Sequence, residues 1–303
     1  MKIAVIGSGI MGAGIVGGFL AGGAHVVLLG RSASKCEDAK TRALELAAGL
    51  RGGTAIALDL IECAQIDDWD DWQGVDLVIE TVTEDLALKQ ALFAALDARV
   101  PAGVPIGSNS SGYPISKIAA GLKTRSRMLG AHYFMPAHIV PLVEVVLGAD
   151  SDPAVGEKVC AIFRALGKKP VLVKKDIPGF LANRIQHAMM REALALIDSG
   201  IASPEDVDLA VRYSFGFRFA AIGPILQKEI SGWDTTYNAA REIYPSLSNT
   251  TSVPGCLAER YAQGKYGMKS GEGFMKWSAE EIKQTRAGYD ARLKAAFEIL
   301  KSG

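Results

Sequence analysis

The N-terminal stretch KIAVIGSGIMGAGIVGGFLAGGAHVVLLG, residues 2–30, places a glycine-rich segment between two apolar ones. KIAVIG and AHVVLLG have the length and unbroken apolar character of strands that are buried on both faces of a parallel sheet. The whole stretch is long enough for a membrane span, but its many glycines would weaken an isolated helix in lipid. A strand-turn-helix-strand unit therefore accounts for it better.

Gly7, Gly9 and Gly12 form the pattern G-x-G-x-x-G at the predicted strand-to-helix junction. The first glycine allows a tight turn, the second lets backbone N–H groups approach a pyrophosphate, and the third lets the helix pack closely on the strand. We predict a dinucleotide site here, with Ile10 and Met11 at the start of the helix also contacting the cofactor. The alternative is a glycine-rich turn with a structural role only.

The end of the second predicted strand bears on which nicotinamide cofactor is used. Dinucleotide sites of this kind usually have Asp or Glu there, which accepts hydrogen bonds from the ribose hydroxyls. This chain has Gly30, followed by Arg31, Ser32, Ser34 and Lys35. A missing carboxylate and added donors favour a 2′-phosphate, so we predict NAD(P) with NADP slightly favoured over NAD. Stacking of Arg31 on the adenine is the alternative.

Composition limits the remaining function classes. The 303 residues carry 33 basic and 33 acidic side chains, so no basic excess exists to hold nucleic acid or an anionic membrane. A small-molecule substrate remains the expected partner. The four cysteines are scattered without the spacing of a metal site, which fits reduced thiols in a cytoplasmic protein and no bound metal; they are Cys36, Cys63, Cys160 and Cys256.

Further apolar segments alternate with helical ones along the first half of the chain. GVDLVIETV, VPIGSNSSG and RMLGAHYF are predicted strands, and this alternation predicts an α/β fold with a doubly wound parallel sheet. Ligands of such sheets lie beyond the carboxyl ends of the strands, where residues 108–111 and His132 fall. From about Asp176 the patterns become helical, so we predict a Rossmann domain at 1–175 and a C-terminal all-α domain at 176–303.

The segment HYFMPAHIVPLVEVV, residues 132–146, places two titratable groups in an apolar run. A carboxylate inside an apolar strand must be paired or protonated, and His132 is the nearest candidate partner of Glu144. A dehydrogenase needs a base for the alcohol proton while hydride leaves the same carbon, and imidazole serves this purpose near neutral pH. His138 is the rival base.

Seven motifs occur together in one order: the N-terminal fingerprint, DLVIETVTEDLALKQ, SNSSG, HYFMPAHIVPLVEVV, KKDIPGFLANR, IGP and YGMKSGEGF. Their order and spacing resemble the 3-hydroxyacyl-CoA dehydrogenase superfamily nearly end to end. The resemblance implies a Rossmann domain followed by a helical domain, usually dimeric. It also implies an oxidoreductase that interconverts a hydroxyl and a ketone with a nicotinamide cofactor.

The same resemblance implies roles for particular residues. His132 matches the catalytic histidine, and Glu144 matches the carboxylate that orients it. Ser111 and Asn183 match the residues that hold the substrate oxygen. Three further positions match residues that contact the cofactor: Glu84, Lys89 and Asn109.

Two departures from the family pattern bear on the substrate. Met135 stands where the family usually has Asn, which implies a reshaped pocket at the substrate and leaves imine reduction open. Residues 46–75 are compact and contain six acids against one base, Arg51, so the nucleotide of coenzyme A would be repelled. The alternative for DDWDDW in this region is a solvated loop with two tryptophan anchors.

The stretch FGFRFAAIGP resembles the branch acting on free hydroxy acids, such as gulonate dehydrogenase with its lambda-crystallin relatives and pyridine-carboxylate dehydrogenases. Arg218 would hold a substrate carboxylate, or would be a surface or dimer-interface residue. We therefore predict a cytoplasmic NAD(P)-dependent dehydrogenase of a small hydroxy acid or polar ketone, homodimeric through its helical domain. The alternatives are a 3-hydroxyacyl-CoA dehydrogenase and a non-catalytic, crystallin-like nucleotide-binding protein.

Overall fold

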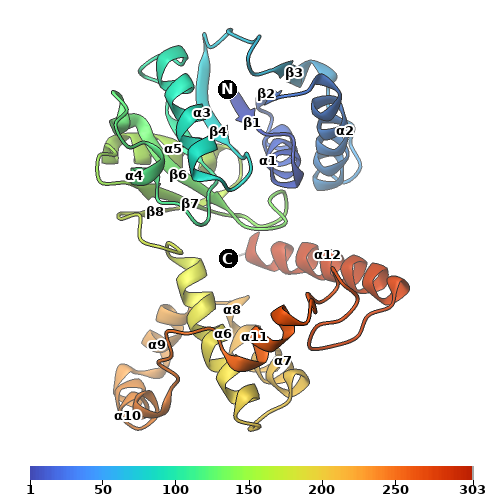
Figure 1. Ribbon diagram of the computed structural model, residues 1–303, viewed down its shortest axis with the longest axis vertical. Helices are drawn as coiled ribbons and strands as arrows, with labels where there is room; N and C mark the ends of the chain where they lie inside the picture. Colours follow the sequence, from blue (N-terminus) through green and yellow to red (C-terminus); the bar gives the residue numbers. More distant parts are fainter. Residues whose placement is uncertain (302–303) are drawn as a thin grey trace. The chain divides into compact units, whose positions relative to one another are not determined.

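The computed structural model describes residues 1–301, which divide into two compact units (Figure 1). The first unit is Met1–Arg184, and the second begins at Ile185. Helix α6 (Ala182–Asp198) starts in the first unit and continues into the second. The predicted domain boundary after residue 175 stays a prediction.

The first unit contains an eight-stranded sheet in the order β3-β2-β1-β4-β5-β6-β7-β8. The chain runs outward from β1 to β3 and then returns to the other side of β1 at β4, which is the reversal expected of a doubly wound sheet. The strands are β1 (Lys2–Ile6), β2 (His25–Gly30), β3 (Ile61–Gln65), β4 (Val75–Glu80), β5 (Ile106–Ser108), β6 (Met128–Tyr133), β7 (Leu142–Leu147) and β8 (Lys169–Val173).

Two features of this sheet were not expected from the sequence. Strand β7 pairs antiparallel with β6, whereas the other neighbouring strands run parallel. Strand β3 is not among the predicted strands, because its sequence IECAQ lacks the unbroken apolar run of a buried strand. As an edge strand it pairs on one side only, with β2.

Helices cover both faces of the sheet (Figure 1). One core cluster joins one face of the sheet to α1 (Ile10–Ala21), α2 (Ala33–Leu50) and α5 (Pro153–Ala165). A second core cluster joins the opposite face to α3 (Leu86–Arg99) and α4 (Ile115–Ile118). This three-layer arrangement confirms the predicted α/β class with a Rossmann sheet.

Aromatic side chains mark the centre of the first core cluster. The rings of Phe19 and Phe163 stack with centroids 6.3 Å apart, and Tyr133 meets both rings edge-on at 6.4 Å and 5.8 Å. Such pairs contribute about 0.5–1.5 kcal/mol each beyond the area that they bury. They hold α1 and α5 against β6, the strand that carries His132.

The acidic stretch between β3 and β4 is anchored by its two tryptophans. Trp69 and Trp72 are buried in the second core cluster and meet edge-on at 4.7 Å. Their indole N–H groups donate to Glu62 (2.9 Å) and Asp70 (3.1 Å). The stretch is therefore a loop with two tryptophan anchors, as one of the two sequence interpretations proposed.

The second unit is mainly helical in its described residues, with two isolated antiparallel bridges between residues 267 and 276. After α6 it contains α7 (Pro204–Tyr213), α8 (Phe215–Phe219), α9 (Pro224–Ser231), α10 (Trp233–Ile243), α11 (Gly255–Ala262) and α12 (Ala279–Lys301). Ser203 caps α7 in a reciprocal capping box with Asp206, and Ser278 and Glu281 bond in the same way at the start of α12. This confirms the predicted helical C-terminal region.

No helix among the described residues has both the length and the apolar character that crossing a bilayer requires.

Lys168 is a buried cation just before β8. Its ammonium group donates to the carbonyl oxygens of Ala137 (2.7 Å) and Val140 (3.1 Å), and it lies 5.7 Å from the centre of the Tyr133 ring. Burial lowers the pKa of Lys168 from 10.5 to about 8. The two hydrogen bonds hold the loop that connects β6 to β7.

This burial makes stability depend on pH in a defined window. The unfolded chain keeps the Lys168 proton up to about pH 10.5, and the folded chain keeps it only up to about pH 8. Below pH 8 the cost of burying the charged ammonium group therefore lowers the stability of the folded state, and this cost disappears as the pH rises from about 8 to about 10.5. We expect the unfolding free energy of the native protein, relative to Lys168→Met, to rise by up to about 3 kcal/mol from pH 8 to 10.5. Urea unfolding at several pH values measures this. A relative stability that stays constant or falls would contradict it.

Candidate active site

The turn between β1 and α1 is tight because two of its glycines are in close contact. Gly7 has a φ of +120°, a conformation that side chains disfavour. A Cβ on Gly12 would lie 1.9 Å from the carbonyl oxygen of Gly7, so only glycine permits this approach. The structure thus gives these two glycines the geometric roles that the sequence predicts.

Gly9 differs from its neighbours because it faces open space. A Cβ on Gly9 would meet no atom within 4 Å. Gly9 is also the N-cap residue of α1, and among the described residues no side chain caps this helix. The N–H groups of the first turn therefore point toward a position where a pyrophosphate would accept them. This cradle fits the phosphates of a dinucleotide.

A cleft of about 500 Å³ opens beside this turn. Its lining includes Gly7, Gly9, Arg31 and Lys35 together with apolar side chains of α3. A volume of this size is typical of small-molecule and cofactor sites. His132 and Ser111 are not among the residues that line it.

The close of β2 has no room for a side chain. A Cβ on Gly30 would lie 2.5 Å from the sulfur of Cys36, which is fully buried at the start of α2. An acidic residue at this position would therefore require the thiol to move. Ser32 is the N-cap residue of α2, and its hydroxyl lies 3.0 Å from that of Ser34. The cleft wall here carries Arg31 and Lys35 without an acid at position 30.

A buried ion pair lies just beyond the end of β4. The ammonium group of Lys89 is 2.7 Å from Glu80 Oε1, and both side chains are almost fully buried, at 1% and 0% exposure. Glu80 Oε1 also accepts from the N–H of Val82 at 2.6 Å, and Glu80 Oε2 accepts from the hydroxyl of Ser108 at 2.6 Å. Several hydrogen bonds thus compensate the cost of burying these two charges.

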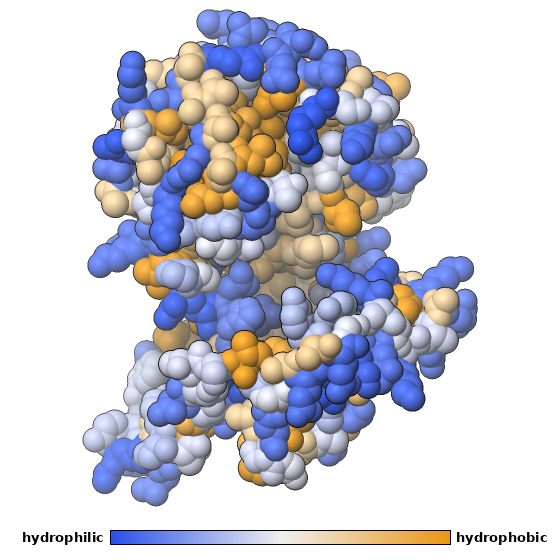
Figure 2. Space-filling model, in the orientation of Figure 1, coloured by the Kyte–Doolittle hydropathy of each residue, from blue (hydrophilic) through white to orange (hydrophobic). Residues whose placement is uncertain are grey.

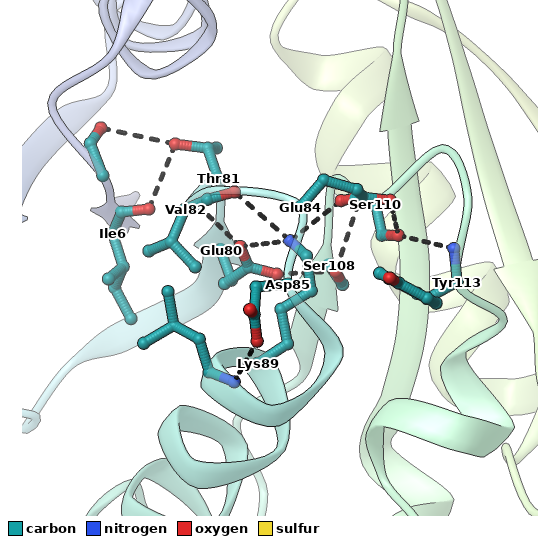
Figure 3. A network of polar contacts seen from close by, with 12 residues as sticks. Ile6, Glu80, Thr81, Val82, Glu84, Asp85, Lys89, Ser108, Ser110 and Tyr113 are labelled. Atoms are coloured by element: carbon teal, nitrogen blue, oxygen red, sulfur yellow. Dashed lines mark hydrogen bonds and ion pairs between the residues drawn. The ribbon is translucent and has the colours of Figure 1, made fainter.

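This geometry changes the interpretation of Lys89. The resemblance implied a contact with the cofactor, but the Lys89 ammonium group is engaged by Glu80 and by Glu84, the latter at 3.4 Å (Figure 3). Lys89 therefore organises the loop between β4 and α3. Its contact with the cofactor stays a prediction.

Glu84 connects that loop to the residues after β5. Its Oε1 atom accepts from the hydroxyl of Ser110 at 2.5 Å and from the N–H of Gly112 at 2.8 Å. Burial alone would raise the pKa of the Glu84 carboxyl, but these hydrogen bonds and the nearby Lys89 charge lower it instead. The carboxylate stays ionised at neutral pH as a result.

His132 and Glu144 are direct partners across the antiparallel strands β6 and β7. The distance between His132 Nδ1 and Glu144 Oε2 is 2.7 Å, and both side chains are buried. This confirms the pairing that the apolar context of Glu144 predicts. Because Nδ1 faces the carboxylate, Nε2 is the ring nitrogen that would meet a substrate.

The other oxygen of Glu144 holds the start of α6. Glu144 Oε1 accepts from the N–H groups of Leu181 (3.0 Å) and Ala182 (2.7 Å). Burial would raise the pKa of the Glu144 carboxyl, but the bonds from His132 and these two amides outweigh burial and lower it. Asn183 follows Ala182 directly, so one carboxylate fixes both the imidazole and the backbone next to Asn183.

Aromatic rings surround the imidazole of His132. Phe134 meets it edge-on with centroids 4.6 Å apart, and Phe180 lies 5.3 Å away. Phe180 has a φ of +48°, which is a strained conformation for a non-glycine residue. Its backbone turns the chain into α6 so that the amides of residues 181 and 182 reach Glu144.

The remaining predicted residues lie in different places. Asn109 Oδ1 accepts from the N–H of Tyr133 at 2.9 Å, which ties the end of β5 to the residue after His132. Ser111 and Met135 are exposed at the same edge of the sheet. Arg218 is exposed on α8, in the second unit. The predicted roles of these residues stay predictions.

Sequence reasoning missed three residues that shape this site, namely Glu80, Cys36 and Phe180. Glu80 had a usable signal, because an acid at the end of an apolar strand needs a partner, as Glu144 does. Cys36 and Phe180 gave none. Their importance depends on packing and on backbone geometry that the sequence pattern does not reveal.

Comparison with known proteins matches this architecture to one family. The model of the 3-hydroxyacyl-CoA dehydrogenase NAD binding domain matches residues 2–177, and the model of the C-terminal domain matches residues 179–277. A 5-formyl-3-hydroxy-2-methylpyridine 4-carboxylate 5-dehydrogenase from Mesorhizobium japonicum is 33% identical over 304 residues, covering 99% of this chain and 98% of the relative.

Two further relatives extend the comparison. An L-carnitine dehydrogenase from Nocardiopsis dassonvillei is 41% identical over 157 residues, which cover 52% of this chain and 48% of that protein. A solved structure, described as a 5-dehydrogenase of the same pyridine carboxylic acid and an NAD+ dependent dismutase, has a TM-score of 0.92 and 32% identity, covering 99% of this chain and 98% of that chain. The chain belongs to the 3-hydroxyacyl-CoA dehydrogenase family.

Proposed function

We propose that this protein is a nicotinamide-dependent dehydrogenase that interconverts the hydroxyl and carbonyl forms of a small carboxylic acid not linked to coenzyme A. The observation that carries the proposal is the 2.7 Å contact between His132 and Glu144 at the carboxyl end of the sheet of this fold. A buried imidazole with a fixed tautomer is the group that such a reaction requires.

The chemistry of the chain's own residues follows from this contact. In the oxidation direction His132 Nε2 accepts the proton of the substrate hydroxyl, and Glu144 stabilises the resulting imidazolium. Ser111 and Asn183 donate hydrogen bonds to the substrate oxygen and polarise it. When bound, the nicotinamide ring accepts or supplies the hydride. In the reduction direction His132 returns the proton.

The preference for free acids over thioesters has two supports. Residues 46–75 include six acids against one base, a poor match for the phosphates of coenzyme A. The relatives from Mesorhizobium japonicum and Nocardiopsis dassonvillei are described as dehydrogenases of a pyridine carboxylate and of L-carnitine. Arg218 would pair with the substrate carboxylate, a role that the charge and planar shape of its guanidinium group suit.

A preference for NADP is part of the proposal. Arg31 and Lys35 line the cleft together with one acid, Asp67, and a side chain at position 30 would require the Cys36 thiol to move. Two cations without a competing carboxylate at that position favour a 2′-phosphate. The solved relative is described as NAD+ dependent, so the two proteins would differ in this respect.

A homodimer formed through the second unit also belongs to the proposal. Among the described residues of that unit, only Leu194 and Cys256 are buried apolar side chains. Tyr213, Phe217 and Ile230 are each more than 70% exposed, and Figure 2 shows apolar side chains on the surface of this unit. A helical unit with so little core gains stability by packing against a second copy.

We also propose a cytoplasmic location, because all four cysteines are unpaired and thiols stay reduced in that compartment.

Substitution of the two paired residues tests the proposed acid-base role. We expect His132→Ala to lower kcat by about 10²–10⁴-fold, the usual contribution of a general base. Glu144→Gln should be nearly as damaging, because its amide group would donate to Nδ1 and leave the proton on Nε2. Its remaining oxygen still accepts from the α6 amides, so thermal unfolding should change little. His138→Ala is the matched control and should retain activity.

A substrate panel tests the proposed reaction class. Steady-state rates with L-carnitine, L-gulonate and 3-hydroxybutyrate should exceed the rate with 3-hydroxybutyryl-CoA under the same conditions. Turnover of the thioester alone would overturn the preference for free acids. Loss of activity in His132→Ala is then measured with the best substrate of the panel.

The cofactor preference is tested at Arg31. We expect Arg31→Gln to raise the KM for NADPH by about tenfold, the cost of losing one charge-assisted hydrogen bond, and to leave the KM for NADH nearly unchanged. Arg51→Gln, which changes an exposed arginine outside the cleft, is the matched control. A native protein that uses NADH more efficiently than NADPH would contradict the proposal.

Sedimentation velocity tests the proposed dimer. We expect a species with twice the 32.1 kDa mass of one chain, and Phe217→Asp should shift it toward the monomer. Leu58→Asp alters an exposed apolar residue of the first unit and should leave the dimer intact. A native protein that sediments as a monomer at micromolar concentration would exclude a stable dimer.

A further inference from the structure

Both chain neighbours of Ser111 bind to one carboxylate. Ser110 donates through its hydroxyl and Gly112 through its N–H, and both bonds end at Glu84 Oε1, at 2.5 Å and 2.8 Å. Figure 3 shows Glu84 beside Ser110 on the loop that follows β5. Glu84 thus holds the two chain neighbours of Ser111 at a single point.

The hydroxyl of Ser110 both donates and accepts a hydrogen bond in this arrangement. It donates to Glu84 and accepts from the N–H of Tyr113 at 2.9 Å, while the N–H of Ser110 donates to the Ser108 hydroxyl at 3.2 Å. Ser110 is buried and Ser111 is exposed. The loop therefore directs one serine inward as an anchor and the next outward.

One further contact holds the Glu84 carboxylate, and Gly112 leaves room for it. Its second oxygen lies 3.4 Å from the Lys89 ammonium group, which is buried against Glu80. A Cβ on Gly112 would lie 3.1 Å from Glu84 Oε1, so any side chain at position 112 would crowd the carboxylate. Glycine at position 112 thus leaves room for the Glu84 carboxylate that accepts its N–H.

We propose that Glu84 is a positioning residue for the substrate: its carboxylate binds the Ser110 side chain and the Gly112 backbone, on either side of Ser111, and so sets the direction of the Ser111 hydroxyl. This inference rests on the proposed function, in which Ser111 bonds the substrate oxygen. It assigns Glu84 a role beyond the cofactor contact that the resemblance implied. Because hydrogen bonds to a reacting oxygen depend steeply on position, loosening the clamp should affect turnover.

The experiment compares variants that break the clamp at different atoms. The variants are Glu84→Ala, Glu84→Gln, Ser110→Ala, Gly112→Ala and Ser111→Ala. The measurements are kcat and KM with the best acid of the substrate panel, and the Kd of NADH and NADPH from nucleotide fluorescence in the absence of substrate. Asp85→Asn is the matched control, because it removes the neighbouring acid while Asn still caps α3.

We expect Glu84→Ala and Ser110→Ala each to lower kcat/KM by about 10- to 100-fold, as for a misplaced catalytic group. The nucleotide Kd of Ser110→Ala should stay within about twofold of the native value, since only the loop contact is lost. The double variant should be little worse than either single one, because both break the same contact. Glu84→Gln, which keeps an acceptor oxygen, should recover part of the activity.

Different results overturn different parts of the account. If Ser111→Ala loses activity but Ser110→Ala and Gly112→Ala do not, the clamp is overturned and the proposed function stands. If Glu84→Ala weakens nucleotide binding as much as it lowers kcat/KM, Glu84 acts through the cofactor and the clamp is again overturned. If Ser111→Ala has native activity, both the role of Ser111 and the clamp fail.

Discussion

The hydrogen bond between His132 Nδ1 and Glu144 Oε2 is the constraint on which the site depends. A carboxylate with no exposed surface must be satisfied by hydrogen bonds or an ion pair, and Glu144 receives them from the imidazole and from two backbone amides at the start of α6. The antiparallel register of β6 and β7 places the two side chains directly opposite each other. One buried anion therefore fixes the base, its tautomer and the helix that carries Asn183.

A second buried anion organises the other half of the edge in a similar way. Glu80 ends β4, pairs with Lys89 and bonds the hydroxyl of Ser108, while Lys89 also lies near Glu84. The loops after β4 and β5 are thereby connected through charge-assisted hydrogen bonds, which are stronger than neutral ones. Because residues 81–83 of the loop after β4 also line the cleft beside Gly9, these hydrogen bonds connect the cleft wall to the serines after β5.

Much of this fold could be predicted from the sequence, because long apolar runs such as β1, β2 and β4 have few alternatives. The edge strand β3 and the antiparallel direction of β7 could not, since hydrophobic patterns carry no strand direction and edge strands need little apolar surface. In the site, the pairing of His132 with Glu144 followed from the cost of burying an acid. The roles of Ser111 and Asn183 rested on family resemblance, and the Glu84 clamp depends on a loop conformation that no pattern encodes.

A crystal structure of the complex with NADP+ and the best acid of the substrate panel tests the central claim most directly. The account predicts that His132 Nε2 lies within hydrogen-bond reach of the substrate oxygen, about 2.6–3.2 Å, while Nδ1 keeps its bond to Glu144. An Nε2 atom that faces away from the substrate, or another base such as His138 in contact with that oxygen, would contradict it.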